Sequence, residues 1–236
     1  MPRPGDVGYA SLWLPDAERA AAFYAAVLGW EYAPGHDPRG RRVPGSAPPQ
    51  GLWGGQARTT LFCSYVVADA AVAAARVRAA GGTAGEPVRQ PYGLSVDCED
   101  SQGMRFALHE PPQPGSPAAA RPGAARDGDL GYITLEVPDG ARARDFYAAV
   151  LGWRIGPGRV TGGWQVTGTA PLIGISGGHA EPTGVPLWRV SDVTAAAQRV
   201  RAAGGTAGEP RPQPYGVVAE CADDQGTRFQ LCQFPG

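Results

Sequence analysis

Apolar residues change their spacing soon after the start of the chain. From Tyr9 to Leu14 they alternate with their neighbours, which predicts a strand. From Asp16 to Gly29 they recur three and four positions apart, which predicts an amphipathic helix. The recurring apolar residues are Ala20, Phe23, Tyr24, Val27 and Leu28. We expect Asp16 to cap this helix at its N-terminus and Gly29 to end it.

The same plan follows further along the chain. A strand is predicted over residues 62–67, then a helix that Asp69 caps and that Gly81 and Gly82 stop. Short extended runs broken by Gly and Pro lead to a tight turn at residues 100–103, and a strand over 104–109 closes the segment. Each module is therefore a strand, a helix and about three strands, and the chain has room for four.

An internal duplication organises the whole sequence. Residues 8–35 return with many identities as residues 131–158, and the twelve residues from Arg76 return letter for letter from Arg199, a shift of 123 positions. Residues 112–127 are mostly Pro, Gly, Ala, Ser and Arg, and predict a linker without a core. We expect a first domain over residues 1–111, this linker, and a second domain over residues 128–236.

Composition narrows the classes of function. The 236 residues carry 21 basic and 22 acidic side chains, so the basic patch of a nucleic-acid binder is not expected. The longest apolar stretch, residues 20–30, is too short to cross a membrane, and the start of the chain has no apolar signal core. We therefore expect a cytoplasmic protein. Its four cysteines are widely spaced, which predicts reduced thiols rather than disulfides or a Cys-rich zinc site.

Two motifs resemble a known superfamily. Residues 16–30 and 139–153 each read as an Asp, then Phe-Tyr, then Val-Leu-Gly-Trp, which resembles the opening of vicinal oxygen chelate proteins. The turns at 100–103 and 223–226, each followed by Arg-Phe-x-Leu, resemble its closing hairpin. The superfamily includes glyoxalase I, bleomycin-resistance proteins and extradiol dioxygenases. The resemblance implies an α+β protein of tandem glyoxalase-like domains, in which four βαβββ modules form two cup-shaped mixed β-sheets.

The metal-ligand positions of the catalytic members are occupied by poor ligands in this chain. The resemblance places these positions at Tyr9, Phe62, Ala107, Tyr132, Val185 and Gln230. Imidazole and carboxylate are the ligands that divalent metals need here, and none of the six supplies one. The three histidines, His36, His109 and His179, lie in dissimilar places and do not predict a chelating triad. We expect no metal and no cofactor.

Strand alternation indicates which side chains line each cup. We expect apolar and aromatic walls with a few polar groups, as in small-molecule sites. The candidate ligand-binding residues are Tyr9, Trp13, Phe62, Arg105, His109, Tyr132, Glu136, Arg228 and Gln230. Because Glu136 stands where the first repeat has Trp13, and Gln230 where it has Ala107, we expect the first cup to be the more apolar one and to take an apolar aromatic ligand.

Simpler structural roles compete with several of these assignments. Trp13 and Phe62 could fill a closed cup as core residues. Arg105 and Arg228 could form internal salt bridges to a carboxylate, such as Asp97 or Glu220. His109, at a strand end, could be a solvated or fully hydrogen-bonded histidine. Glu136 is different, because a carboxylate that points into a partly apolar cup is unusual.

The leading hypothesis is metal-independent binding of a small hydrophobic or aromatic molecule. Resemblance to the resistance proteins implies sequestration of a drug or natural product. The alternative is a metal-free cyclase, isomerase or lyase of natural-product metabolism that uses Glu136 or His109 as its acid or base. A weaker alternative is a glyoxalase-like lyase or dioxygenase with relocated metal ligands. The expected partner is a small molecule, with no nucleic acid or membrane, and the chain is expected to be a monomer or homodimer.

Overall fold

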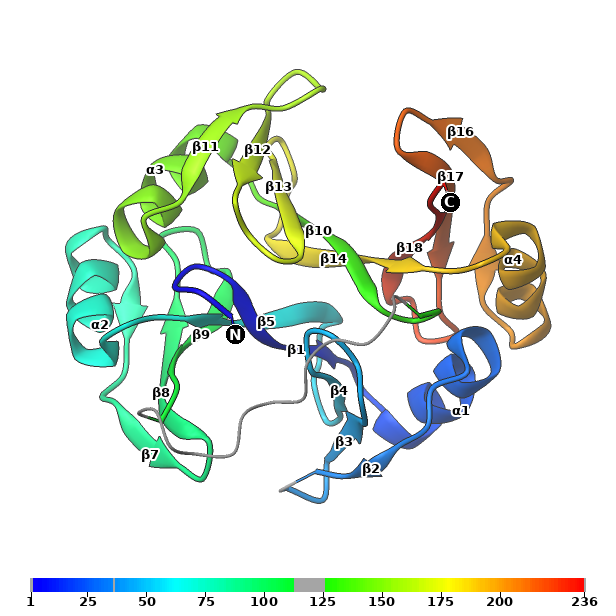
Figure 1. Cartoon of the computed structure of the whole chain (residues 1–236), viewed down its shortest axis with the longest axis horizontal. Coiled ribbons are helices and arrows are strands. Elements are labelled where there is room, and N and C mark those ends of the chain that lie inside the picture. Colours follow the sequence, from blue (N-terminus) through cyan, green and yellow to red (C-terminus); the bar gives the residue numbers. More distant parts are fainter. Residues whose placement is uncertain (1, 36, 113–125, 236) are drawn as a thin grey trace. The chain divides into compact units, whose positions relative to one another are not determined.

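A computed structural model describes residues 2–35, 37–112 and 126–235 (Figure 1). The α+β class, the duplication and the four modules are confirmed, and each module begins with a strand followed by a helix. The predicted linker, apart from Pro112, Arg126 and Asp127, lies outside the described residues, as does His36. No helix among the described residues is long and apolar enough to cross a membrane.

Each repeat contributes one mixed nine-stranded sheet. The first has the order β2-β3-β4-β1-β5-β9-β8-β6 with β7 paired to β8, and the second has the order β11-β12-β13-β10-β14-β18-β17-β15 with β16 paired to β17. The first-repeat strands are β1 (Val7–Trp13), β2 (Ala33–Pro34), β3 (Gly40–Val43), β4 (Gln50–Trp53), β5 (Thr60–Val66), β6 (Thr83–Ala84), β7 (Val88–Gln90), β8 (Gly93–Glu99) and β9 (Arg105–Glu110). The second-repeat strands are β10 (Leu130–Glu136), β11 (Arg154–Pro157), β12 (Gly163–Thr167), β13 (Leu172–Ser176), β14 (Thr183–Arg189), β15 (Thr206–Ala207), β16 (Arg211–Gln213), β17 (Gly216–Ala222) and β18 (Arg228–Gln233).

The helices begin where the sequence predicts. They are α1 (Ala17–Leu28), α2 (Ala70–Ala79), α3 (Gly140–Leu151) and α4 (Val193–Ala202). Asp16 and Asp69 accept hydrogen bonds from main-chain N–H groups in the first turns of α1 and α2, as N-caps do. Gly29 ends α1 in the left-handed conformation, with φ at 70°, which glycine adopts without steric cost.

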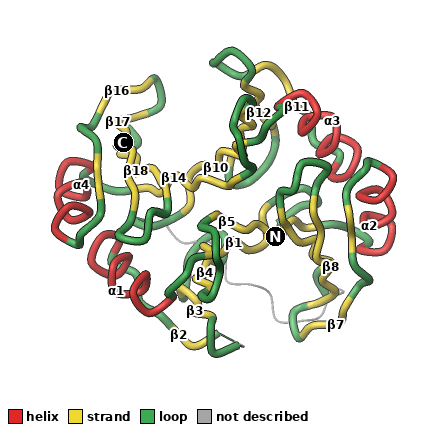
Figure 2. Tube along the Cα trace, turned by 180° about the vertical axis from the view of Figure 1, so that it is seen from behind, coloured by secondary structure: helices red, strands yellow, loops and turns green. Residues whose placement is uncertain are grey.

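The chain forms two compact units, and each unit combines modules from both repeats. The first unit comprises Met1–Ala10, Phe62–Arg121 and Thr134–Gly184, and the second comprises Ser11–Leu61, Pro122–Ile133 and Val185–Gly236. Accordingly α2 packs beside α3 in the first unit, and α1 packs beside α4 in the second (Figures 1 and 2). The two domains predicted at residues 1–111 and 128–236 follow the duplication and remain a prediction.

The repeated Phe-Tyr and Trp motif forms the aromatic core of each unit. In the first unit the Tyr147 ring lies 5.2 Å from the Trp153 ring and 5.9 Å from that of Phe106, and all three residues are buried. In the second unit the Tyr24 ring lies 5.3 Å from Trp188. Since burial of a large aromatic side chain contributes about 1.5–3 kcal/mol, this motif has a structural function in holding two modules together.

The closing turns dock onto the helices of the other repeat. In the first unit the buried carboxylate of Asp100 accepts from the N–H groups of Gln102 and Met104 and from the Tyr147 hydroxyl at 3.2 Å. The Gln102 amide meanwhile donates to the Asp139 carbonyl and accepts from the Asp139 N–H. In the second unit the Asp223 carboxylate likewise accepts a hydrogen bond from the Tyr24 hydroxyl, at 3.1 Å. Both turn motifs are therefore used in packing.

Candidate functional site

In the first unit, strand register defines a face opposite the helices. Phe106 and Leu108 of β9 are buried toward the helices, so Ala107 and His109 point to the other side. Residues in register on neighbouring strands share a face, and the register pairs Ser64 with Ala107 and Ser95 with His109. We name this surface the His109 face, and it consists of Phe62, Ser64, Ser95, Ala107 and His109. The predicted site residues Phe62, Arg105 and His109 thus lie on one side of this part of the sheet.

His109 is the most distinctive group on the His109 face. Its ring is half-buried, lies 5.6 Å from the Tyr92 ring, and has a buried Nδ1 with no hydrogen-bond partner among the described residues. Burial lowers the pKa of His109 below its usual value, although a hydrogen bond to the Leu94 main chain and the charge of Glu110 act in the opposite direction. The imidazole is therefore neutral near pH 7, and its Nδ1 is a buried polar atom without a hydrogen bond among the described residues.

The equivalent face of the second unit is filled by side chains. Leu187, Val218 and Cys232 form a buried cluster against which Tyr132 and Phe234 pack. The Arg189 guanidinium lies 4.4 Å from the Phe234 ring, and burial raises the pKa of Cys232 to about 11. Tyr132, a predicted ligand wall, therefore packs against the protein itself. On these strands the first repeat is the more polar of the two, which is opposite to the difference expected from the sequence.

The remaining predicted residues are distributed over both units. Tyr9 lies in the first unit and Trp13 in the second, and both are half-buried. Arg105 and Arg228 are exposed, and the register places Glu99, not Asp97, directly opposite Arg105. Gln230 is half-buried and lies opposite Glu220. The structure therefore groups Phe62, Arg105 and His109 but does not collect all nine candidates into one described site.

Glu136 has partners that the sequence analysis missed. Its Oε2 lies 3.3 Å from Nδ1 of His179, and Nε2 of that ring lies 3.0 Å from Oγ of Ser176. The Glu136 side chain is only 13% exposed, so the carboxylate is largely desolvated. The sequence contains a signal for this cluster, because the repeats differ at all three positions. The shift of 123 positions aligns Glu136, Ser176 and His179 with Trp13, Trp53 and Gln56.

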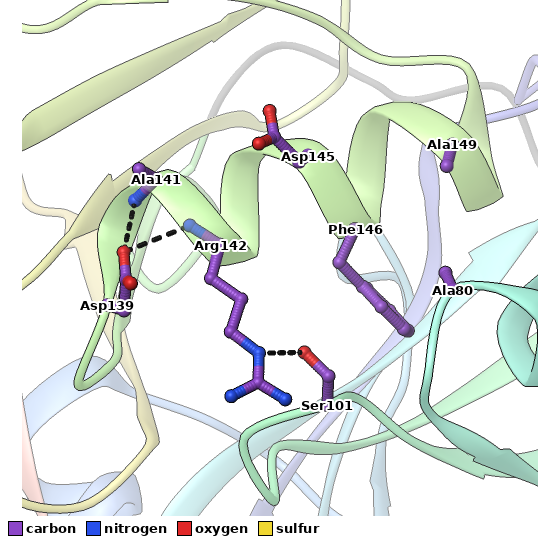
Figure 3. Close-up of a pocket in the computed structure, with 8 residues that line it drawn as sticks. All are labelled: Ala80, Ser101, Asp139, Ala141, Arg142, Asp145, Phe146 and Ala149. Carbon is purple, nitrogen blue, oxygen red and sulfur yellow. Dashed lines mark hydrogen bonds between the residues drawn. The ribbon is translucent and has the colours of Figure 1, made fainter.

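A surface hollow lies where α3 meets the first closing turn. It has a volume of about 510 Å³ and is lined by residues of α3, that turn and the end of α2 (Figure 3). Inside it Arg142 Nε donates to Ser101 Oγ at 3.0 Å. The equivalent Arg19 in the second unit forms an ion pair with Asp224. The hollow therefore belongs to the helix–turn contact described above.

Comparison with known proteins identifies the fold. The glyoxalase-like domain matches residues 11–109 and again residues 132–232. A Mn(II)-bound glyoxalase from Novosphingobium aromaticivorans superimposes with a TM-score of 0.74 at 18% identity, covering 99% of this chain and 83% of that chain. The 2,3-dioxygenase LapB from Pseudomonas sp. KL28 gives 0.72 at 15% identity, covering 99% and 96%. An extradiol ring-cleaving dioxygenase from B. fuscum gives 0.73 at 17% identity, covering 100% and 73%. No curated protein matches the sequence significantly.

The side chains at the positions expected to bind metal do not fit a divalent ion. Ala107 and Val185 are buried hydrocarbon groups, 4% and 7% exposed, and cannot coordinate a metal. Within the described ranges, no three His, Cys, Asp or Glu side chains form a group that could hold one. All four cysteines are buried, and burial raises the pKa of Cys63, Cys98 and Cys221 to about 12, which disfavours the thiolate that binds metal.

Proposed function

Because the chain belongs to the glyoxalase-like domain family and contains its domain twice, we propose that it binds a small hydrophobic or aromatic molecule without a metal ion. The observation that carries this proposal is the unpartnered, buried Nδ1 of His109 beside the Tyr92 ring. A buried polar atom without a hydrogen bond costs about 1–3 kcal/mol, and a ligand that turns the ring and bonds to Nδ1 would recover this cost. Phe62 and Tyr92 supply aromatic contacts to a planar ligand.

Sequestration of a drug or natural product is the biological role we propose for this binding. A sequestering protein needs affinity, and no group on it has to move a proton. The contrast between the repeats supports one site on the first-repeat sheet, because the equivalent second-repeat face is occupied by its own apolar cluster.

Calorimetric titration can test the proposal with p-cresol, catechol and 4-hydroxybenzamide as planar probes that carry one or two polar groups. We expect His109→Ala to weaken binding about tenfold, the loss of one net hydrogen bond. Cys232→Ala changes the equivalent position of the other repeat and should leave the affinity unchanged. Addition of EDTA should also have no effect. Equal affinities for the parent and His109→Ala would place the ligand elsewhere.

A metal-free cyclase, isomerase or lyase is the second candidate. The lowered pKa of His109 favours it, because a neutral imidazole can accept a proton from a bound substrate at pH 7. Chromatography of the recovered ligand separates the two functions. A new compound in excess of one equivalent per chain, abolished by His109→Ala, would establish the enzyme, whereas unchanged ligand supports the binding protein.

A further inference from the structure

The loop that carries His179 has the same main-chain structure in both repeats. Hydrogen bonds join equivalent atoms at nearly equal distances. The matched pairs are Val137 N to Ser176 O at 2.9 Å with Leu14 N to Trp53 O at 3.1 Å, and His179 N to Val137 O at 3.1 Å with Gln56 N to Leu14 O at 3.1 Å. The first repeat builds this loop with two tryptophans and a glutamine, so the polar side chains of the second repeat are not needed to form it.

Those three polar side chains are arranged as a nucleophile, a base and an orienting acid. The Glu136 carboxylate beside Nδ1 favours the tautomer that carries its proton there, which leaves the Nε2 lone pair directed at the Ser176 hydroxyl. The 3.0 Å distance between Oγ and Nε2 is within the range for proton transfer. All three residues belong to the first unit, within Thr134–Gly184. We propose that Ser176, His179 and Glu136 form a second site, at which small carboxylic esters acylate Ser176.

Ester hydrolysis at this site needs only these three side chains and water. Ser176 Oγ attacks the ester carbonyl carbon while His179 Nε2 takes the hydroxyl proton, and the Glu136 carboxylate stabilises the resulting imidazolium. The bond from the carbonyl carbon to the alcohol oxygen then breaks, and the imidazolium returns its proton to the departing alcohol. Water, deprotonated by the same imidazole, releases the acid and restores Ser176.

The surroundings of Ser176 are compatible with this step. Ser176 is half-buried and the His179 side chain is 33% exposed, so a small ester can reach the pair. Gly177 and Gly178 follow Ser176 and add no side chains that would block it. The main-chain nitrogen of Gly140, the first residue of α3, lies 2.8 Å from the point that a Cβ on Gly177 would occupy. The N-terminus of α3 therefore lies beside the main chain that directly follows Ser176.

A fluorophosphonate probe tests the nucleophile directly on the full chain. Attack by Oγ on phosphorus expels fluoride, and intact mass followed by peptide mapping should show one adduct per chain, at Ser176. With p-nitrophenyl acetate, Ser176→Ala, His179→Gln and Glu136→Gln should each lower the catalysed rate at least ~100-fold. Ser191→Ala is the matched control, because the Ser191 hydroxyl donates to a carboxylate, that of Asp127, and is not paired with a histidine.

Several results would overturn the proposal. Absence of an adduct on the parent protein would do so even if a variant failed to fold, and so would an adduct at another residue. Hydrolysis that Ser176→Ala leaves unchanged would also exclude Ser176. Ser176→Cys should retain acylation, detected as a thioester by mass, because it preserves the nucleophile. A Ser176 hydroxyl that only ties the loop to His179 would give no fluorophosphonate adduct in the parent protein.

Discussion

Removal of the Tyr147 hydroxyl tests whether the Phe-Tyr motif holds modules together. In Tyr147→Phe the ring stays, and only the hydrogen bond to the Asp100 carboxylate, 3.2 Å long, is lost. Burial raises the pKa of Tyr147 well above its usual value, so the phenol remains protonated and donates. A hydrogen bond to a charged group contributes about 1.5–3 kcal/mol, and we expect that loss in the free energy of unfolding. The thermal midpoint should fall by roughly 3–12 °C.

Two matched variants accompany this change. Tyr24→Phe removes the equivalent bond to Asp223 in the second unit and should have a similar cost. Tyr32→Phe is the control, because the Tyr32 hydroxyl is buried with no partner among the described residues, and its removal should be neutral or stabilising. The assay is urea unfolding followed by tryptophan fluorescence, with circular dichroism to verify a single transition.

The pH dependence gives an independent check. Burial raises the pKa of Asp100 despite its three hydrogen bonds, so the folded state holds this proton more tightly than the unfolded chain. The destabilising contribution of Asp100 is therefore present at pH 7 and is lost as the pH falls through its raised pKa. Since the protonated carboxyl needs the Tyr147 donor less, the cost of Tyr147→Phe should shrink at acidic pH. A cost below ~0.5 kcal/mol at pH 7, or one equal to that of Tyr32→Phe, would refute the reasoning.

Three further predictions concern titration, metal and thiols. Because the pKa of His109 is lowered in the fold, stability should decline as the pH falls below about 6.5, and urea titrations should show a smaller decline in His109→Gln. Elemental analysis after dialysis should find no stoichiometric Zn, Mn, Ni or Fe. One equivalent of any of them would contradict the expectation that a site with Phe62 and Ala107 at ligand positions holds no metal. The four buried cysteines should resist Ellman's reagent at pH 8 until guanidinium unfolds the chain, and rapid labelling of the native protein would show that a thiol is accessible.

Local order could be predicted from the sequence because it depends on neighbouring residues. The helix that begins after Asp16 and ends at Gly29 follows from apolar spacing, a side-chain cap and a glycine, all within fifteen positions. The burial of Phe106 and Leu108 follows from strand alternation. Part of the candidate site could be predicted in the same way, since alternation along one strand places Arg105 and His109 on the same face.

The pairing of modules could be decided only by the tertiary structure. Near-identical repeats carry the same local signals, so no local rule tells which helix the turn at Asp100 will contact. The structure shows that it contacts α3, where the Tyr147 hydroxyl donates to Asp100. The cluster of Glu136, Ser176 and His179 is likewise formed only by the tertiary structure. Its members lie up to 43 positions apart in sequence and meet where β10 and β13 end, because main-chain hydrogen bonds join Val137 to Ser176 and to His179. Distances of about 3 Å between side chains are set by how strands are joined, which periodicity and composition do not encode.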